Sequence, residues 1–197
     1  MAAVQLTEAD VPRAAGLVAR AFDADPLLVH MLPDASLRAR LGRVHMEPVV
    51  RMCCRHGACW RTLDWDAVAA WMPPGTWPPD PEWVERCGFE QAAAAVGAEA
   101  MRRFNAVYAL TDSFHDNVPQ PYWLLNIVAT EPERRGRGAA SAVLAPALER
   151  AAQERCACYL ETFEEHNLGF YERHGFEVLC SARDDASGIR CWGMLRR

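Results

Sequence analysis

A glycine-rich turn constrains the fold of this chain more than any other feature of its sequence. The turn spans residues 135–140 and reads Arg-Gly-Arg-Gly-Ala-Ala; it follows the apolar run 122–130 and opens an alanine- and leucine-rich segment. We expect a strand, a turn and a helix in that order. Glycine lets the backbone approach an anion closely, and the first free N–H groups of a helix point at it. The segment therefore predicts a phosphate-binding cradle.

The cradle fits neither of the two common nucleotide-binding fingerprints. The chain has no Gly-x-x-x-x-Gly-Lys-Ser/Thr pattern. Gly136 and Gly138 are not followed by the third glycine that a dinucleotide-binding turn requires. These absences exclude a P-loop and a Rossmann reading of the turn, so we expect a different phosphate-bearing ligand.

Composition predicts one domain, residues 1–197, because 197 residues with 51% hydrophobic side chains can build a sizeable core. The net charge of −5 argues against nucleic acid as a partner and is compatible with an amine substrate. We find no signal peptide and no apolar run of the ~18 residues that a membrane span needs. We therefore expect a cytoplasmic protein with no membrane partner.

Eight cysteines raise the question of disulfides or a metal. Cys53, Cys54, His56 and Cys59 lie close together in the sequence, but paired C-x-x-C knuckles and a second ligand cluster are both missing. We expect reduced thiols, most of them buried, and no metal ion.

The hydrophobic pattern alternates between short strands and longer helical segments. Expected strands are residues 4–6, 58–63, 67–72, 123–130, 157–162, 176–181 and 189–195. Expected helices are residues 7–22, 26–32, 34–56, 83–95, 99–114, 139–155 and 167–174. This order predicts an α/β fold with a mixed sheet and helices on both of its faces.

A second motif lies downstream of the cradle, in residues 167–176, which read Asn-Leu-Gly-Phe-Tyr-Glu-Arg-His-Gly-Phe. With the Arg135-x-x-Gly138-x-Ala140 spacing of the cradle, it resembles the GCN5-related N-acetyltransferase (GNAT) superfamily. The resemblance implies a central, mostly antiparallel sheet with helices on both faces. It also implies that the cradle holds the pyrophosphate of acetyl-CoA, the co-substrate, and that the downstream helix supplies an asparagine and a tyrosine near the thioester.

A closer resemblance is to puromycin N-acetyltransferase-like enzymes. It rests on residues 10–14, 22–26, 160–162, 167–173 and 191–192, and it is weak over residues 38–109. It implies acetylation of a small-molecule amine, in antibiotic resistance or in a natural-product biosynthetic or self-protection step. Asp25 stands where those enzymes have a tyrosine, so the identity of the acceptor does not transfer.

The resemblance assigns the cofactor contacts. The backbone of the cradle and the dipole of its helix would hold the pyrophosphate, while Arg135 and Arg137 add charge-assisted contacts. A backbone N–H near Val128 would stabilise the oxyanion, on a strand that splays from its neighbour in this superfamily. The expected cofactor-binding residues are Val128, Thr130, Arg135, Gly136, Arg137, Gly138, Ala139, Ala140 and Asn167.

Tyr171 is the candidate general acid, because a phenol is protonated at neutral pH and can donate to a departing sulfur. Asn167 lies one helical turn earlier, on the same face. The structural alternatives are a packed core tyrosine for Tyr171 and a helix N-cap for Asn167.

The candidate general base is Glu161, acting directly or through a water, and a strand-end carboxylate paired with an arginine is an equally good reading. His115 is an alternative base or pocket residue, or else a surface or capped loop histidine. Asp25 and His30 are candidate acceptor contacts, although helix termination also explains an aspartate before a proline.

Three function hypotheses follow: a small-molecule N-acetyltransferase, an acetyltransferase of protein N-termini or side chains, and a non-catalytic acyl-CoA-binding protein. The prolines and tryptophans of residues 73–83 would form a lid over a pocket, which favours a small substrate. Monomer and homodimer, and acetyl and longer acyl donors, all remain open at this point.

Overall fold

The computed structural model covers residues 1–197 and centres on one seven-stranded sheet, in the order β1-β2-β3-β4-β5-β7-β6. The strands are β1 (Ala3–Gln5), β2 (Cys59–Thr62), β3 (Ala67–Met72), β4 (Tyr122–Thr130), β5 (Ala157–Thr162), β6 (Glu177–Arg183) and β7 (Arg190–Arg196). Only the β4–β5 pair is parallel; every other neighbouring pair is antiparallel. The predicted mixed, mostly antiparallel sheet is confirmed.

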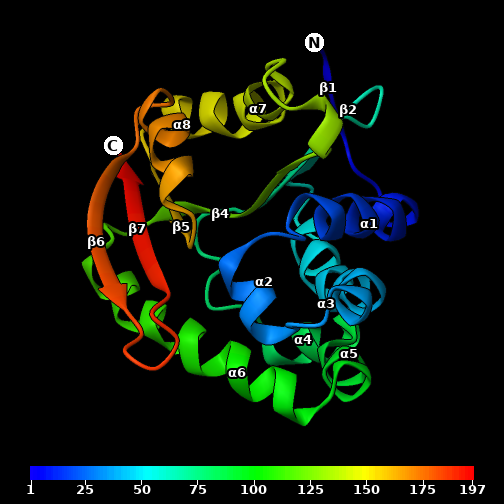
Figure 1. Ribbon diagram of the computed structural model, residues 1–197. Coiled ribbons are helices and arrows are strands. Elements are labelled where there is room, and N and C mark those ends of the chain that lie inside the picture. Colours follow the sequence, from blue (N-terminus) through cyan, green and yellow to red (C-terminus); the bar gives the residue numbers. More distant parts are fainter.

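Helices cover both faces of this sheet (Figure 1). They are α1 (Val11–Ala21), α2 (Pro26–Met31), α3 (Ala35–Cys54), α4 (Pro81–Cys87), α5 (Phe89–Val96), α6 (Ala98–Tyr108), α7 (Ala139–Glu154) and α8 (Leu168–Glu172), with short 3₁₀ segments at Glu8–Asp10, Ala109–Asn117, Pro132–Arg134 and Glu165–Asn167. Helices α1 to α6 lie on one face, while α7 and α8 lie on the other. None of the helices is long and apolar enough to cross a membrane.

The side-chain alternation of the central strands divides the core into two clusters. On β3, Val68, Ala70 and Met72 face α1 and α3, while Ala67, Ala69 and Trp71 face α7. The whole strand is buried because it is covered on both sides. Trp71 is fully buried and packs edge-to-face on Trp123. It is therefore a core residue and does not line a pocket.

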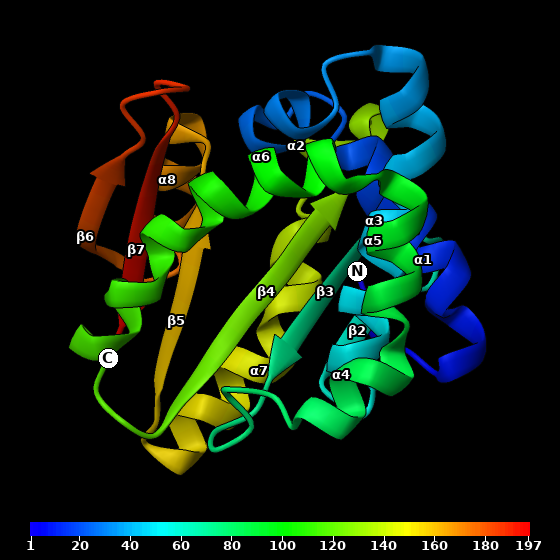
Figure 2. The ribbon, with the colours of Figure 1, turned by 90° about the horizontal axis from the view of Figure 1, so that it is seen from below.

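The strands β4 and β5 pair over only part of their length. Their parallel ladder joins Tyr122–Leu125 to Ala157–Leu160 and stops there, whereas β4 continues to Thr130 against β3 alone. The register of β3 and β4 shifts between Ala70 and Trp71, which leaves Asn126 without a direct partner on β3. Figure 2 shows β4 and β5 diverging from a common end. The divergence that the superfamily resemblance implied is present.

The helical middle of the chain is more broken than the pattern predicts. The helix expected over residues 83–95 is two helices, because Gly88 adopts a left-handed φ of 89° and ends α4. The helix expected over residues 99–114 stops at Tyr108 and continues as the 3₁₀ segment Ala109–Asn117. Several short helices in place of two longer ones let this region curve around the cavity described next.

Candidate functional site

The divergence of β4 and β5 opens onto a cavity of about 1110 Å³. Its lining includes the β4 backbone and residues at the end of β5, together with helices from both faces of the sheet. On one side lie the start of α7 and the helix α8; on the other lie α2, α3, α5 and α6. The cavity therefore connects the two faces, and its volume exceeds that of an ordinary single-ligand pocket.

The predicted cradle forms the α7 end of this cavity. Gly136 and Gly138 have left-handed φ values of 75° and 81°, and the space beside each Cα is open. Helix α7 begins at Ala139, and its first internal hydrogen bond runs from Ala142 N–H to the Gly138 carbonyl. The N–H groups of the preceding residues have no partner in the helix. Such a concave row of N–H groups at a sixteen-residue helix suits an anion.

The loop that carries the cradle is tied to the C-terminal end of α1. The Arg135 guanidinium donates to the Ala21 carbonyl at 2.7 Å. Arg20 donates two hydrogen bonds to the Glu131 carboxylate, which directly precedes the loop. Arg135 still lines the cavity, whereas Arg137 is exposed and lies outside the lining. The structure thus gives Arg135 a local anchoring contact and does not bring Arg137 into the cavity.

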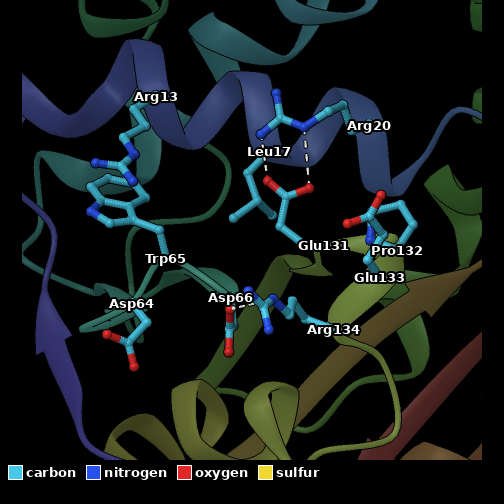
Figure 3. A pocket seen from close by; sticks show the side chains of 10 residues that line it. All are labelled: Arg13, Leu17, Arg20, Asp64, Trp65, Asp66, Glu131, Pro132, Glu133 and Arg134. Carbon is cyan, nitrogen blue, oxygen red and sulfur yellow. Dashed lines mark hydrogen bonds and ion pairs between the residues drawn. The ribbon is translucent and has the colours of Figure 1, made fainter.

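A second, smaller pocket of about 470 Å³ lies beside the same loop (Figure 3). Its charged side chains largely pair with one another: Arg20 with Glu131, and Arg134 with Asp66 at 3.5 Å. Arg13 lies over the Trp65 ring at 4.2 Å. Because most of the opposite charges are paired with each other, these side chains hold the loop that leads to the cradle in place.

The geometry of β4 directs two backbone N–H groups into the gap beside β5. The Glu131 N–H donates to the Asp66 carbonyl at 2.8 Å, which makes these opposite residues a hydrogen-bonded pair. Hydrogen-bonded and non-bonded pairs alternate along an antiparallel ladder, so Ala129 bonds to β3 as well. Val128 and Thr130 therefore turn their N–H groups the other way, where β5 no longer pairs.

The helix α8 presents Tyr171 to the cavity, with Asn167 one turn earlier. Tyr171 is only 7% exposed and packs edge-to-face against the rings of Phe170 and Phe176. Burial raises the pKa of its phenol well above the ordinary value, and the Asp25 carboxylate raises it further. The phenol is therefore held protonated. The Asn167 side chain makes no capping hydrogen bond, which leaves its amide available to the cavity.

The Glu161 carboxylate lies on β5 within a set of aromatic donors. Its Oε1 accepts from the Tyr159 hydroxyl at 3.1 Å and lies 3.1 Å from His115 Nε2. Both contacts use the same oxygen, so Oε2 remains available as an acceptor. No arginine pairs with Glu161, so the expected alternative of a strand-end ion pair with arginine is wrong.

His115 is held at both ring nitrogens. Its Nδ1 lies 2.7 Å from the Tyr122 hydroxyl, opposite the Nε2 contact to Glu161. The imidazole stacks on Trp77, with ring centroids 5.1 Å apart. The surface-histidine alternative is therefore wrong. His115 lines the cavity, but because both nitrogens are engaged it orients Glu161 and has no free nitrogen to act as a base.

Asp25 lines the cavity and also caps α2. Its Oδ1 accepts from the N–H groups of Leu27 and Leu28 at 2.9 and 3.2 Å. Burial raises its pKa to about 6, against the lowering effect of those two bonds, and the Glu164 carboxylate raises it as well. Helix capping and cavity lining are thus both present in one residue.

His30 does not join this site. It lies on α2 outside the cavity lining, within electrostatic range of Asp184. We therefore withdraw it as an acceptor contact. No group of three or more histidine, cysteine or acidic side chains is arranged to hold a metal ion, and all eight cysteines are free thiols.

Several cavity residues were missed at the sequence level. The Ser141 hydroxyl lies 3.0 Å from His174 Nε2 and ties the start of α7 to the end of α8. Phe104 stacks on Tyr108, with centroids 5.2 Å apart, and lies 4.8 Å from the His45 ring. His174 follows Tyr171 in the downstream motif and could have been suspected from it. The aromatic residues carry no local signal that distinguishes them from core residues.

Comparison with known proteins decides the family. The model of the acetyltransferase (GNAT) family matches residues 60–176, which is more than half of the chain. The chain belongs to the GNAT acetyltransferase family. The matched region runs from β2 through the cradle and α8. It includes every candidate site residue except Asp25 and His30, and this family uses acetyl-CoA as co-substrate.

The relatives of this GNAT protein are distant. An uncharacterised N-acetyltransferase of Schizosaccharomyces pombe is 25% identical over 183 residues, covering 89% of this chain and 74% of the relative. An acetyltransferase of Corynebacterium glutamicum related to histone acetyltransferase HPA2 is 24% identical, with a TM-score of 0.60 over 99% of this chain and 94% of that one. The polyamine N-acetyltransferase of Drosophila melanogaster is 14% identical, with a TM-score of 0.65 over 98% and 97%. The structural likenesses show the fold alone.

Proposed function

We propose that residues 1–197 form a single N-acetyltransferase domain that transfers the acetyl group of acetyl-CoA to a small-molecule amine. One observation carries the proposal: a single cavity passes through the gap between β4 and β5 and reaches both faces of the sheet. On one face it ends at the anion cradle. On the other it widens into the part lined by α2, α3, α5 and α6, which we call the apolar chamber. A donor bound on the first face and an acceptor bound on the second would meet at this gap.

The cradle would hold the pyrophosphate through the backbone from Gly136 to Ala140. The open space at both glycines supports this fit, since a Cβ there would occupy the path of an approaching phosphate. Asn167 is proposed to bind the amide-rich arm of the co-substrate. Arg135 would add charge at the cradle, while Arg137, at the surface, would contribute only long-range attraction.

In the proposed reaction, the amine nitrogen forms a bond to the thioester carbonyl carbon, and the carbon–sulfur bond then breaks. The N–H groups of Val128 and Thr130 stabilise the oxyanion that develops on the carbonyl oxygen. The nitrogen attacks in its neutral form, so Glu161, through its free Oε2 or an intervening water, first accepts a proton from the bound ammonium. The second proton, which the nitrogen loses as the amide forms, passes to solvent. Tyr171 donates its proton to the departing sulfur, and its protonated state supports this role.

A small-molecule acceptor is favoured over a protein substrate because helices and a proline-rich loop cover part of the apolar side of the cavity. Helices α2 and α6, which both line this side, contact each other, and Trp77 and Pro79, from the segment predicted to act as a lid, belong to the lining. A protein N-terminus would need an open groove. Solved structures with this fold include N-acetyltransferases of small amines such as agmatine, which fits the proposal.

The resemblance to puromycin N-acetyltransferase-like enzymes suggests antibiotic inactivation or natural-product self-protection as the biological setting. We propose a cytoplasmic protein, monomeric or homodimeric, that works without a metal ion. Asp25 and His115 are proposed acceptor-side residues, Asp25 by its charge and His115 through its contact with Glu161.

The function is tested by titrating acetyl-CoA into the protein calorimetrically and by following thiol release over a panel of amines. We expect saturable binding of acetyl-CoA and thiol release that depends on the amine. If acetyl-CoA does not bind, the proposed function is wrong. Tight binding without turnover on any amine would favour a non-catalytic acyl-CoA-binding protein, and acetylated proteins detected by mass spectrometry in place of small amines would favour the protein-directed alternative.

A further inference from the structure

The acceptor half of the cavity is apolar and rich in aromatic rings. Twelve of its lining residues come from α3 to α6: His45, Met46, Val49, Met52, Val84, Phe89, Ala92, Ala93, Met101, Phe104, Asn105 and Tyr108. Phe104 and Tyr108 are stacked with an interplanar angle of 14°, and Tyr108 continues toward Phe163 at 6.5 Å. This wall suits a broad apolar or aromatic body, because such a body replaces water over large apolar areas.

The negative charges of the cavity are confined to one end. Among its lining residues, the only carboxylates are Asp25, Glu161 and Glu164. Glu161 lies near the end of β5, Glu164 two residues beyond that strand, and Asp25 interacts with both Glu164 and Tyr171. Glu164 is also paired with His166 at 2.8 Å. A negative counter-charge for a cation is therefore present only beside the proposed reacting atoms.

The helical wall offers no carboxylate to a second positive charge. Its polar side chains are His45, Asn105 and Tyr108. Burial lowers the pKa of His45 to about 4, so this imidazole is neutral at neutral pH. Burial also raises the pKa of the Tyr108 phenol, which keeps it uncharged. A second ammonium or guanidinium group placed here would lose its hydration without gaining a counter-charge.

From these observations we propose that the acceptor is an amine with a single positive charge on a bulky apolar, preferably aromatic, body, and that it is not a diamine or polyamine. The proposal rests on the proposed function of the cavity and deepens it. It assigns the charged end of the acceptor to the carboxylates at the strand gap and its apolar body to the wall of α3 to α6.

A matched pair of ligands tests the charge requirement. Octylamine and octamethylenediamine have the same chain length and differ only in the second amine, and naphthylethylamine against ethylamine tests the aromatic body. With saturating acetyl-CoA, we expect kcat/KM for octylamine to exceed that for the diamine by at least about tenfold. We expect naphthylethylamine to exceed ethylamine by about a hundredfold or more, in line with the range for added apolar groups in a fitting pocket.

A matched pair of variants tests the location of the wall. Ala93 and Ala94 are neighbours on α5, but Ala93 lines the cavity whereas Ala94 is exposed and does not. Ala93→Glu places a carboxylate in the wall and should shift the kcat/KM ratio of diamine to octylamine about tenfold toward the diamine. Ala94→Glu carries the same change of side chain on the same helix and should leave the ratio unchanged.

The outcomes separate this inference from the proposed function. Wild-type preference for the diamine, or identical ratios in folded Ala93→Glu and Ala94→Glu, would overturn the inference and leave an amine acetyltransferase standing. Failure of every amine to release thiol would overturn the proposed function and the inference with it. If Ala93→Glu proves unfolded by circular dichroism, the wild-type ligand pairs alone decide.

Discussion

Tyr171 shows how burial holds a phenol in its protonated form. A phenol in an apolar setting resists ionisation, and the adjacent Asp25 carboxylate strengthens that resistance. The same environment stops Tyr171 from acting as a base. Glu161 differs in the way it is held: Tyr159 and His115 both contact its Oε1, which fixes the carboxylate while the second oxygen stays available. The proposed reaction assigns opposite proton transfers to these two groups, donation to Tyr171 and acceptance to Glu161.

We predict that Tyr171→Phe lowers kcat by about 10²–10⁴, the usual contribution of a positioned acid, while the Kd for acetyl-CoA changes less than about threefold. The ring and its packing are retained, so only the proton donor is lost. Thiol release measures the first quantity and calorimetry the second. An unchanged kcat would remove Tyr171 from the acid role.

Asp25 gives a pH-dependent prediction. Its pKa is raised to about 6 from an ordinary 3.8, so between these values the folded protein retains a proton that the unfolded chain has lost. Stability from this group is therefore complete below pH 3.8 and is lost as pH rises through about 6. Asp25→Asn keeps a capping oxygen but carries no charge.

The variant should be more stable than the wild type near neutral pH by about 1–3 kcal/mol, and the difference should shrink as the pH falls toward 4. Urea unfolding of both proteins at several pH values measures this. A difference independent of pH would show that the Asp25 charge carries no cost in the folded protein. A simultaneous loss of amine kcat/KM would mark its charge as part of acceptor binding.

At the scale of elements, the pairing of β5 with β7 supports Glu161, the proposed base. Gly193 on β7 lies opposite Glu161, and a Cβ at this position would meet the Tyr159 hydroxyl at 2.6 Å and Cys180 Sγ at 2.8 Å. Because Gly193 has no side chain, the Tyr159 ring can lie close to β7 while its hydroxyl donates to Glu161. The glycine at position 193 on β7 thus allows the contact that positions the Glu161 carboxylate on β5.

Gly193→Ala should displace Tyr159, destabilise the fold by about 1–3 kcal/mol and lower kcat without weakening acetyl-CoA binding. Gly16→Ala on α1 is the matched control, because its new Cβ would make only ordinary contact, at 3.5 Å, and alanine favours a helix. Thermal unfolding and steady-state kinetics of both variants provide the comparison. If the two variants behave alike, the close approach at Gly193 has no consequence.

Where an element depends on local sequence alone, the sequence was sufficient to predict it. The glycines of the cradle and the alanine-rich run after it predicted the strand, turn and helix that carry the anion site. The break at Gly88 was missed because a glycine inside an apolar helical pattern is compatible both with a continuing helix and with a left-handed end. Neither the end of the β4–β5 ladder nor the resulting N–H orientation has a local signature, since both depend on strand pairing.

At the scale of the whole molecule, the cavity is assembled from segments between Ala21 and His174. The contact between His115 and Glu161 joins a 3₁₀ segment to a strand 46 residues later. The residues alone suggested both as candidates but not that one would hold the other. The prediction that His30 contacts the acceptor was wrong for the same reason. Its helix was expected, but whether His30 faces the cavity depends on how α2 packs.

The sheet itself provides the connection between the two half-sites. Because β4 and β5 pair at one end and separate at the other, the proposed donor and acceptor would each bind on one face and meet through the opening. The central claim is therefore geometric: one continuous cavity should bind donor and acceptor together.

A bisubstrate ligand tests this claim most directly. The best amine of the panel is joined to CoA through an acetyl bridge, and its affinity is compared calorimetrically with that of CoA alone. We expect one ligand per chain and a Kd at least about 10²-fold lower than that of CoA, as for ligands that span both half-sites in the transition state. A Kd equal to that of CoA would mean that the amine does not reach the chamber through the β4–β5 gap, and it would contradict the proposed site.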